Sequence, residues 1–331
     1  MLETVVTLLL AAHLLTMNVA SAGPLVGTWL LLRHEDSLAN SRGRTSGRVF
    51  RLSLASLVAG SLLGGCLLLV PNESLRAALR RFPADAYWFA GIELLFSAGC
   101  ILALILGGAW LAKRRRLAAV IALLSATNLL YHFPPLMAVL GELAADPRWA
   151  ADEQINRAAL LRLWARPEIL ALWVHFVLAS LAVAPIAALW PSPRRPTHAT
   201  SIESQQIVRR LAGGALAATV LQIPVGLWLL ATSDATARDS MLGQDLFASA
   251  CFAGGVLAAL WLLQTLAAIV LGDEDSAVRR AGLLLVLVTT LMSATLRASR
   301  TPSIEKAPRE NAKAPSLDTS RTPMASVGVE P

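Results

Sequence analysis

Long apolar stretches recur along this chain, and they decide what it can fold into. Each is about 20 residues long with almost no charge inside it, which matches the roughly 30 Å hydrocarbon core of a bilayer at 1.5 Å of helical rise per residue. The sequence therefore predicts an all-α integral membrane protein with about eight transmembrane helices arranged as two four-helix bundles. The expected spans are 4–32, 50–71, 87–112, 117–141, 169–190, 211–232, 246–271 and 279–297.

The spans divide the chain into three parts. We expect residues 1–145 to form a first four-helix membrane bundle and residues 146–298 an interfacial helix plus a second four-helix membrane bundle. Residues 299–331 are rich in Pro, Ser, Thr and charge and have little to bury, so this tail is predicted to be disordered. Two connections, Glu73–Phe82 and Asn156–Glu168, have the amphipathic pattern of helices that lie in the membrane interface; a partner docking site is the alternative.

The net charge of +7 follows the connections between spans and does not form a nucleic-acid-binding patch. The first, third and fifth connections are the basic ones, and basic loops stay on the cytoplasmic side. This pattern predicts a multi-pass protein of the cell inner (plasma) membrane with an extracytoplasmic N-terminus, although the basic residues of the tail oppose that orientation.

Four ionisable side chains lie inside the expected spans, where a charge costs roughly 2.5–3.5 kcal/mol at the helix centre. They are His13, Glu93, His132 and His175. Counting residues from the outer ends of the spans puts them roughly 9–14 Å below the outer face, within about one helical turn of each other. Polar or soft neighbours surround this level and are candidates to support it: Met17, Asn128, Tyr131 and Gln222.

Imidazoles delivered by the helices of a bundle are a common way to hold haem iron. Pro134 and Pro135 follow His132, and the missing N–H groups should leave the carbonyls near Leu130 and Tyr131 free for a partner. Covalent haem attachment is unsupported, because none of the three cysteines lies in a CxxCH motif.

Three other interpretations stay open. The histidines could only bridge helices in a small transporter or structural subunit. With the glutamate they could hold zinc, copper or non-haem iron. A proton or ion pathway could run through Glu93.

The order of these features carries a family resemblance. His13 stands early in the first span, Glu93 in FAGIELLFSAG, an Asn precedes the aromatic stretch in SATNLLYHFPPLMAVLG, and His175 stands in WVHFVLAS. Over residues 1–232 the chain thus resembles the haem-bearing subunit I of cytochrome bd-type quinol oxidases. The resemblance implies a helical haem-binding bundle, and an oxidoreductase related to quinol oxidases as the activity.

The chain departs from this family at three points. Its seventh span contains no methionine, where the family supplies a haem ligand, and only about a dozen residues around Asp234–Asp245 replace the long quinol-binding loop. A GRxPW-type segment is missing as well. Quinol oxidation and oxygen reduction therefore stay open, and His132 would pair with His13 or with His175 as a bis-imidazole site of this chain's own.

Electron transfer by one or two b-type haems, with a quinone as a further cofactor, is the predicted function. The proposed iron ligands are His13, His132 and His175, and the wider cofactor-binding set adds Glu93, Met17 and Asn128. Catalytic residues are not assigned. The expected partners are a quinone pool or an extracytoplasmic redox protein, with further membrane subunits and no nucleic acid.

Overall fold

Helices make up all the regular structure of the computed structural model, which describes residues 2–32, 39–145, 154–190, 202–272 and 275–300. Eight helices in this part of the chain are long and apolar enough to cross a membrane, which confirms the predicted class. They are α1 (Leu2–Leu32), α2 (Ala39–Leu69), α4 (Ala84–Leu106), α6 (Arg115–Ala145), α8 (Pro167–Leu189), α9 (Ile202–Thr232), α11 (Leu246–Leu271) and α12 (Asp275–Arg300). The predicted disordered tail lies outside the described residues, except for its first two, which end α12.

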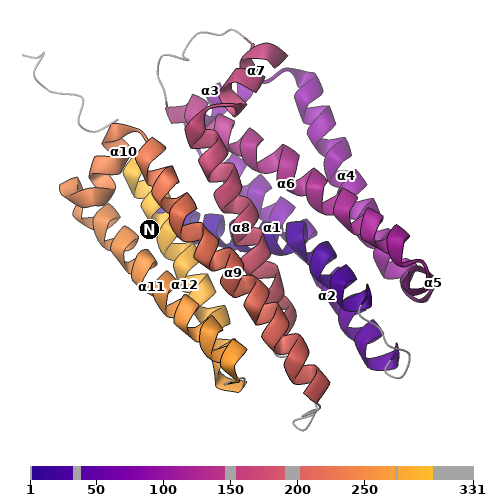
Figure 1. Cartoon of the computed structure of the whole chain (residues 1–331). Coiled ribbons are helices and arrows are strands. Elements are labelled where there is room, and N and C mark those ends of the chain that lie inside the picture. Colours follow the sequence, from indigo (N-terminus) through magenta and orange to yellow (C-terminus); the bar gives the residue numbers. More distant parts are fainter. Residues whose placement is uncertain (1, 33–38, 146–153, 191–201, 273–274, 301–331) are drawn as a thin grey trace, which may run out of the picture.

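The long helices run alongside one another in two groups that meet at α1 (Figure 1). Helices α1, α2, α4 and α6 pack in one ring, and α8, α9, α11 and α12 pack in a second. Helix α1 also packs on α8 and α12, so it belongs to the cores of both groups. One cluster of buried side chains draws on six helices from the two groups; it includes Val26, Val49, Leu189, Leu211, Leu266 and Val278.

Short helices form in both connections that the sequence marks as amphipathic. They are α3 (Glu73–Arg80) and α7 (Arg157–Trp164), and each starts at an asparagine whose side chain accepts a backbone N–H. The two connections join where the Ile155 N–H donates to the Arg81 carbonyl over 2.9 Å. Together they cover one end of α6 and α8 (Figure 1).

The third span ends earlier than predicted. Helix α4 stops at Leu106, and a separate short helix, α5 (Gly108–Lys113), follows. A Cβ atom at Gly107 would lie 2.8 Å from the Ala103 carbonyl oxygen, so this turn needs glycine. The apolar pattern continues across the break, which is why the pattern alone predicts one helix.

Glycines bring α1 and α2 close together over most of their length. Gly27 faces the ring of Phe50, while Gly60 and Gly64 of α2 face Met17 and His13 of α1. Small residues four positions apart on one helix let two membrane helices approach closely. This close packing fixes which side of α1 carries His13.

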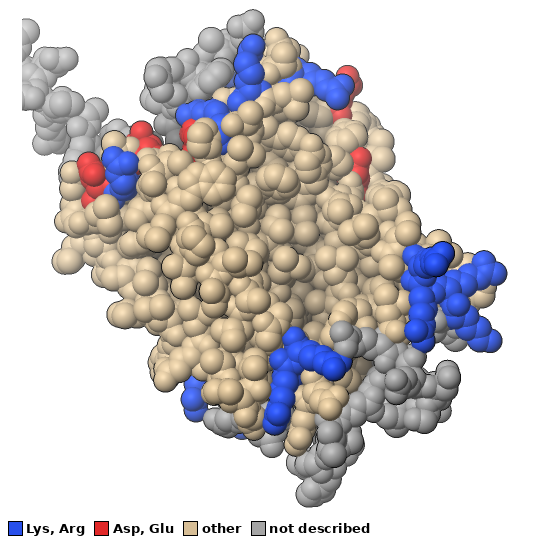
Figure 2. Space-filling view, viewed as in Figure 1, with Lys and Arg blue, Asp and Glu red and all other residues tan. Residues whose placement is uncertain are grey.

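The two ends of the molecule differ in charge. On the face drawn in Figure 2, the end opposite α3 and α7 displays Lys and Arg, whereas the other end displays both signs. At that other end Arg297 of α12 makes an ion pair with Glu3 of α1. The N-terminal end of α1 and the C-terminal end of α12 therefore lie on the same side of the membrane, as an even number of crossings requires.

Candidate functional site

A polar cluster joins α4 to α6 through Asn128. The Asn128 side-chain amide donates to the Glu93 carbonyl and to the Ser97 hydroxyl, each over 2.8 Å. Its oxygen lies 2.8 Å from His132 Nδ1. Since an amide oxygen only accepts, His132 Nδ1 is the donor in this bond, and in a neutral ring the lone pair would then lie on Nε2.

The carboxylate of Glu93 lies beside this histidine. Its Oε2 atom is 3.6 Å from His132 Nδ1, and its side chain is 17% exposed. Phe89 and Tyr131 contact the His132 ring edge-on, with centroids 5.5 and 5.1 Å away. The structure therefore brings two of the four predicted groups, Glu93 and His132, into one partly exposed polar site, supported by the predicted neighbour Asn128.

His13 lies in the interface between α1 and α2. Its Nδ1 atom is 2.8 Å from the Gly60 carbonyl oxygen, which only accepts, so Nδ1 is again the donor and a neutral ring would have its lone pair on Nε2. A Cβ atom at Gly64 would lie 2.8 Å from the ring, so the imidazole packs directly on the α2 backbone. The predicted neighbour Met17 also contacts α2, at Gly60.

His175 has a different environment on α8. Its Nδ1 atom is buried and has no hydrogen-bond partner among the described residues. Buried polar atoms nearly always have a partner, so this ring nitrogen is a candidate for binding a ligand.

Two hydrogen bonds test the expectation that the histidines share one depth. Ser180 of α8 donates to Asn18 of α1 over 2.7 Å, and these residues follow His175 and His13 by five positions each. Because both helices run the same way through the bundle, His13 and His175 lie at the same level.

The second bond relates His175 to His132. The Trp173 indole donates to the Leu130 carbonyl over 2.7 Å, and each of these residues precedes its histidine by two positions. Helices α8 and α6 run in opposite directions, so the two histidines are offset by about 6 Å along the bundle axis. The common depth is confirmed to within about this distance.

The same bond confirms the prediction about the prolines. Helix α6 continues through Pro134 and Pro135, and the carbonyl that Pro134 leaves unpaired is that of Leu130. Its partner, Trp173, was not anticipated from the sequence, nor were Ser97, Asn18 and Ser180. The predicted neighbour Gln222 has no hydrogen bond to any of the four groups among the described residues.

A common depth does not make a common cavity. An aliphatic cluster of Ala20, Leu57, Ile101 and Leu129 fills the space between α1, α2, α4 and α6, with Ala20 and Ile101 about 10–12 Å deeper than His13 and Glu93. Met17, Leu94 and Phe133 pack against this cluster on the side of the histidines. No ring contact joins two of the three imidazoles in the described part of the chain, so the expected facing pairs are not formed. Within that part, no three His, Cys, Asp or Glu side chains gather closely enough to hold a metal ion, and the zinc or copper alternative gains no support.

These residues have the donor chemistry for a haem. In their neutral forms two imidazoles would present a lone pair at Nε2 with Nδ1–H held by an acceptor, the usual arrangement of an iron-bound histidine. A cavity of about 210 Å³ between α6, α7 and α8 is lined by Tyr131, Pro135, Leu161, Trp164, Ala165, Ile169, Leu170 and Trp173, and by none of the histidines. It is smaller than most ligand pockets.

Comparisons with known proteins give one weak likeness. No protein-family model and no curated protein matches the sequence. Among solved structures, the chain is similar to bd oxidase from Geobacillus thermodenitrificans, with 14% identity over 90% of this chain and 83% of that chain and a TM-score of 0.48. A likeness of this size supports no inference about the function.

Proposed function

We propose that this protein is a membrane-embedded b-type haem protein that transfers electrons, with His13, His132 and His175 as axial ligands of one or two haems. The observation that carries the proposal is the hydrogen bonding of two imidazoles, whose Nδ1 atoms lie 2.8 Å from acceptor oxygens of Gly60 and Asn128, so that a neutral ring would offer Nε2 to a metal. Haem, when bound, would supply a one-electron couple inside the bilayer.

The residues around His132 would tune such a site. Asn128 holds the ring in one orientation, because its own amide is fixed by two acceptors on α4. Glu93 would offset positive charge at the imidazole or hold a proton beside it, since its carboxylate lies 3.6 Å from Nδ1. Met17 would contribute a soft sulfur one helical turn from His13.

Binding at these histidines requires a local opening of the packed interior. All three histidines are half-buried, so none of them has to leave a fully buried position. The buried Nδ1 of His175 gains a partner if that ring turns during binding.

The proposed setting is the inner (plasma) membrane, with the N-terminus outside and the basic end of the molecule in the cytoplasm (Figure 2). Electrons would then pass near the outer face, between a quinone pool and an extracytoplasmic redox protein or further membrane subunits. Quinol oxidase activity would be one form of this chemistry.

A non-redox membrane protein is the second candidate, and a specific observation favours it. His13 already bridges α1 to α2, and His132 is part of the bridge from α4 to α6. In a transporter or structural subunit these bonds would be the whole purpose of the histidines.

Absorption spectroscopy of the purified full chain separates the two candidates. The haem proposal expects a Soret band and reduced-minus-oxidised α bands of b-type haem in protein from haem-replete cells. Single His13→Ala, His132→Ala and His175→Ala variants should each lose absorbance where the residue binds iron. His198→Ala, in the connection between α8 and α9, is the control and should keep the full spectrum. A colourless wild-type preparation that is folded by circular dichroism would exclude the haem proposal and leave the bridging role.

A further inference from the structure

A groove at the basic end of the molecule belongs to none of the features above. It lies between α1, α8 and α9 and has a volume of about 570 Å³, within the usual range of ligand sites. Helices α1 and α8 contribute Leu25, Val26, Trp29 and Pro185, and α9 contributes Arg210, Leu211 and Gly214. Six of the seven lining residues are uncharged, and one is a cation.

The groove is polar at one end and apolar at the other. Helices α1 and α9 run in opposite directions, so Trp29 and Arg210 both lie toward the basic end, and Leu25 and Gly214 lie one turn deeper, about 6 Å away. Tryptophan and long basic side chains are enriched at the level of lipid headgroups. The depth profile therefore matches an amphiphile with its head at Arg210 and its tail directed into the membrane.

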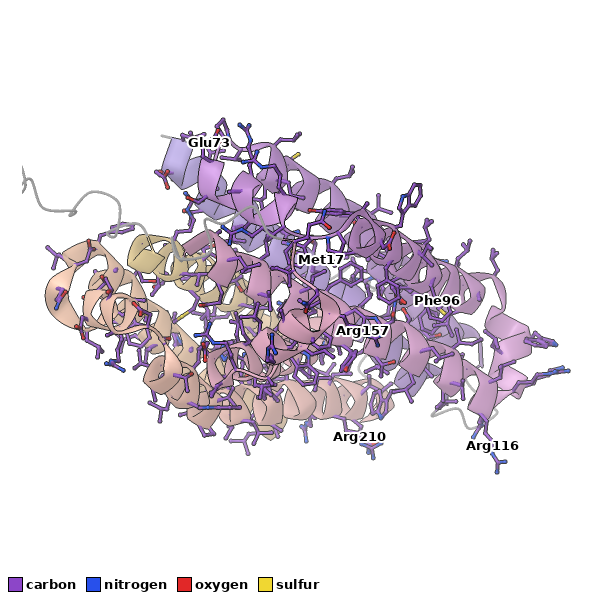
Figure 3. The ribbon with its side chains drawn as sticks, turned by 90° about the horizontal axis from the view of Figure 1, so that it is seen from above. Met17, Glu73, Phe96, Arg116, Arg157 and Arg210 are labelled. Carbon is purple, nitrogen blue, oxygen red and sulfur yellow. The ribbon has the colours of Figure 1, made fainter. Side chains whose placement is uncertain are left out.

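Arg210 is available to such a ligand. It is exposed and makes no ion pair or hydrogen bond with another described residue. Figure 3 shows it at the periphery of the helix bundle. Its neighbour Arg209 is used differently, because the guanidinium of Arg209 packs against Gly272.

The deep end of the groove has free space. A Cβ atom built at Gly214 meets nothing within 4 Å, so this glycine leaves room over the α9 backbone. A soluble anion would use Arg210 alone and would leave this apolar part empty. A lipid with its own ammonium group would gain less from an unpaired arginine than a lipid with net negative charge.

We infer that this groove binds one anionic phospholipid, with the phosphate on Arg210 and an acyl chain along Leu25, Leu211 and the space above Gly214. Native mass spectrometry of the detergent-solubilised full chain tests this, with dioleoylphosphatidylglycerol and dioleoylphosphatidylcholine as probes. The wild type should retain one phosphatidylglycerol more tightly than phosphatidylcholine.

Two variants address the two ends of the groove separately. Arg210→Gln should weaken phosphatidylglycerol binding about fivefold, the effect of roughly 1 kcal/mol for one basic residue at a membrane surface, and should weaken phosphatidylcholine binding less. Gly214→Leu fills the apolar part and should abolish retention of both lipids.

Each variant has a matched control. Arg280→Gln removes an exposed arginine of α12 that does not line the groove, and Gly226→Leu adds the same side chain in open space further along α9. Both controls should bind like the wild type. An equal loss in Arg280→Gln would show that only the general surface charge attracts lipid, and competition by inorganic phosphate would show that the apolar part is unused; either result overturns the inference.

Discussion

Replacing Trp173 with phenylalanine should remove one hydrogen bond between α6 and α8 and keep an aromatic ring in place. The indole donates to the Leu130 carbonyl over 2.7 Å, and this carbonyl needs a donor because Pro134 has no N–H. Phenylalanine can retain the edge-on contact with Tyr131, whose ring centroid is 5.9 Å from that of Trp173.

The expected cost is about 1 kcal/mol of unfolding free energy. Hydrogen bonds between membrane helices average about 0.6 kcal/mol and reach about 1.7 kcal/mol. The value here should lie toward the upper part of that range, because the substitution leaves an acceptor without a partner. In a Pro134→Ala background the restored N–H of residue 134 can donate to Leu130, so the same tryptophan substitution should cost about 0.5–1 kcal/mol less.

Reversible unfolding in mixed SDS micelles, followed by far-ultraviolet circular dichroism, measures these energies for the wild type, the two single variants and the double variant. Trp261→Phe, at an exposed position of α11, is the control and should cost little. The reasoning is refuted if Trp173→Phe costs the same with proline and with alanine at position 134, since the two changes would then act independently.

Two further predictions concern glycines, and thermal unfolding in detergent checks both. Gly27→Ala should lower stability by about 1–3 kcal/mol because the added Cβ would lie 2.5 Å from the fully buried ring of Phe50. The control Gly65→Ala adds a Cβ that meets nothing within 4 Å and should be neutral. Equal stability of these two variants would argue against close packing of α1 on α2. Gly243→Ala, in the η3 turn (Ser240–Gln244) between α9 and α11, should cost about 1–2 kcal/mol from backbone strain alone, since its φ is 132° and the space around it is open; an unchanged melting temperature would contradict this.

The sequence predicts the crossings well because bilayer thickness fixes the length of each span. It also predicts depth to about one helical turn, since residues are counted along helices of known rise: counting puts His13 about 5 Å deeper than His175, and the two are found at the same level. The free carbonyl near Leu130 follows from Pro134 alone. Its donor, Trp173, lies 43 residues away and could not be found by counting.

The sequence does not predict which neighbouring helix each polar side chain faces. The spans are apolar on nearly every side, so the pattern does not indicate which face of a helix turns inward. Glu93 and His132 meet because α4 packs on α6, whereas His13 turns toward α2, where Gly60 and Gly64 admit its ring. The break at Gly107 is hidden for a related reason, since Trp and Leu continue the apolar run beyond it.

The bond between Asn18 and Ser180 has a consequence for how the chain is made. These partners are 162 residues apart, and synthesis proceeds at about 5–20 residues per second, so Asn18 is added to the chain roughly 8–32 s before Ser180. During that time a polar amide, later buried, must be shielded from lipid by water, by an insertion factor or by the lateral gate of the translocation machinery. The first helix thus completes this contact only after α8 has been made.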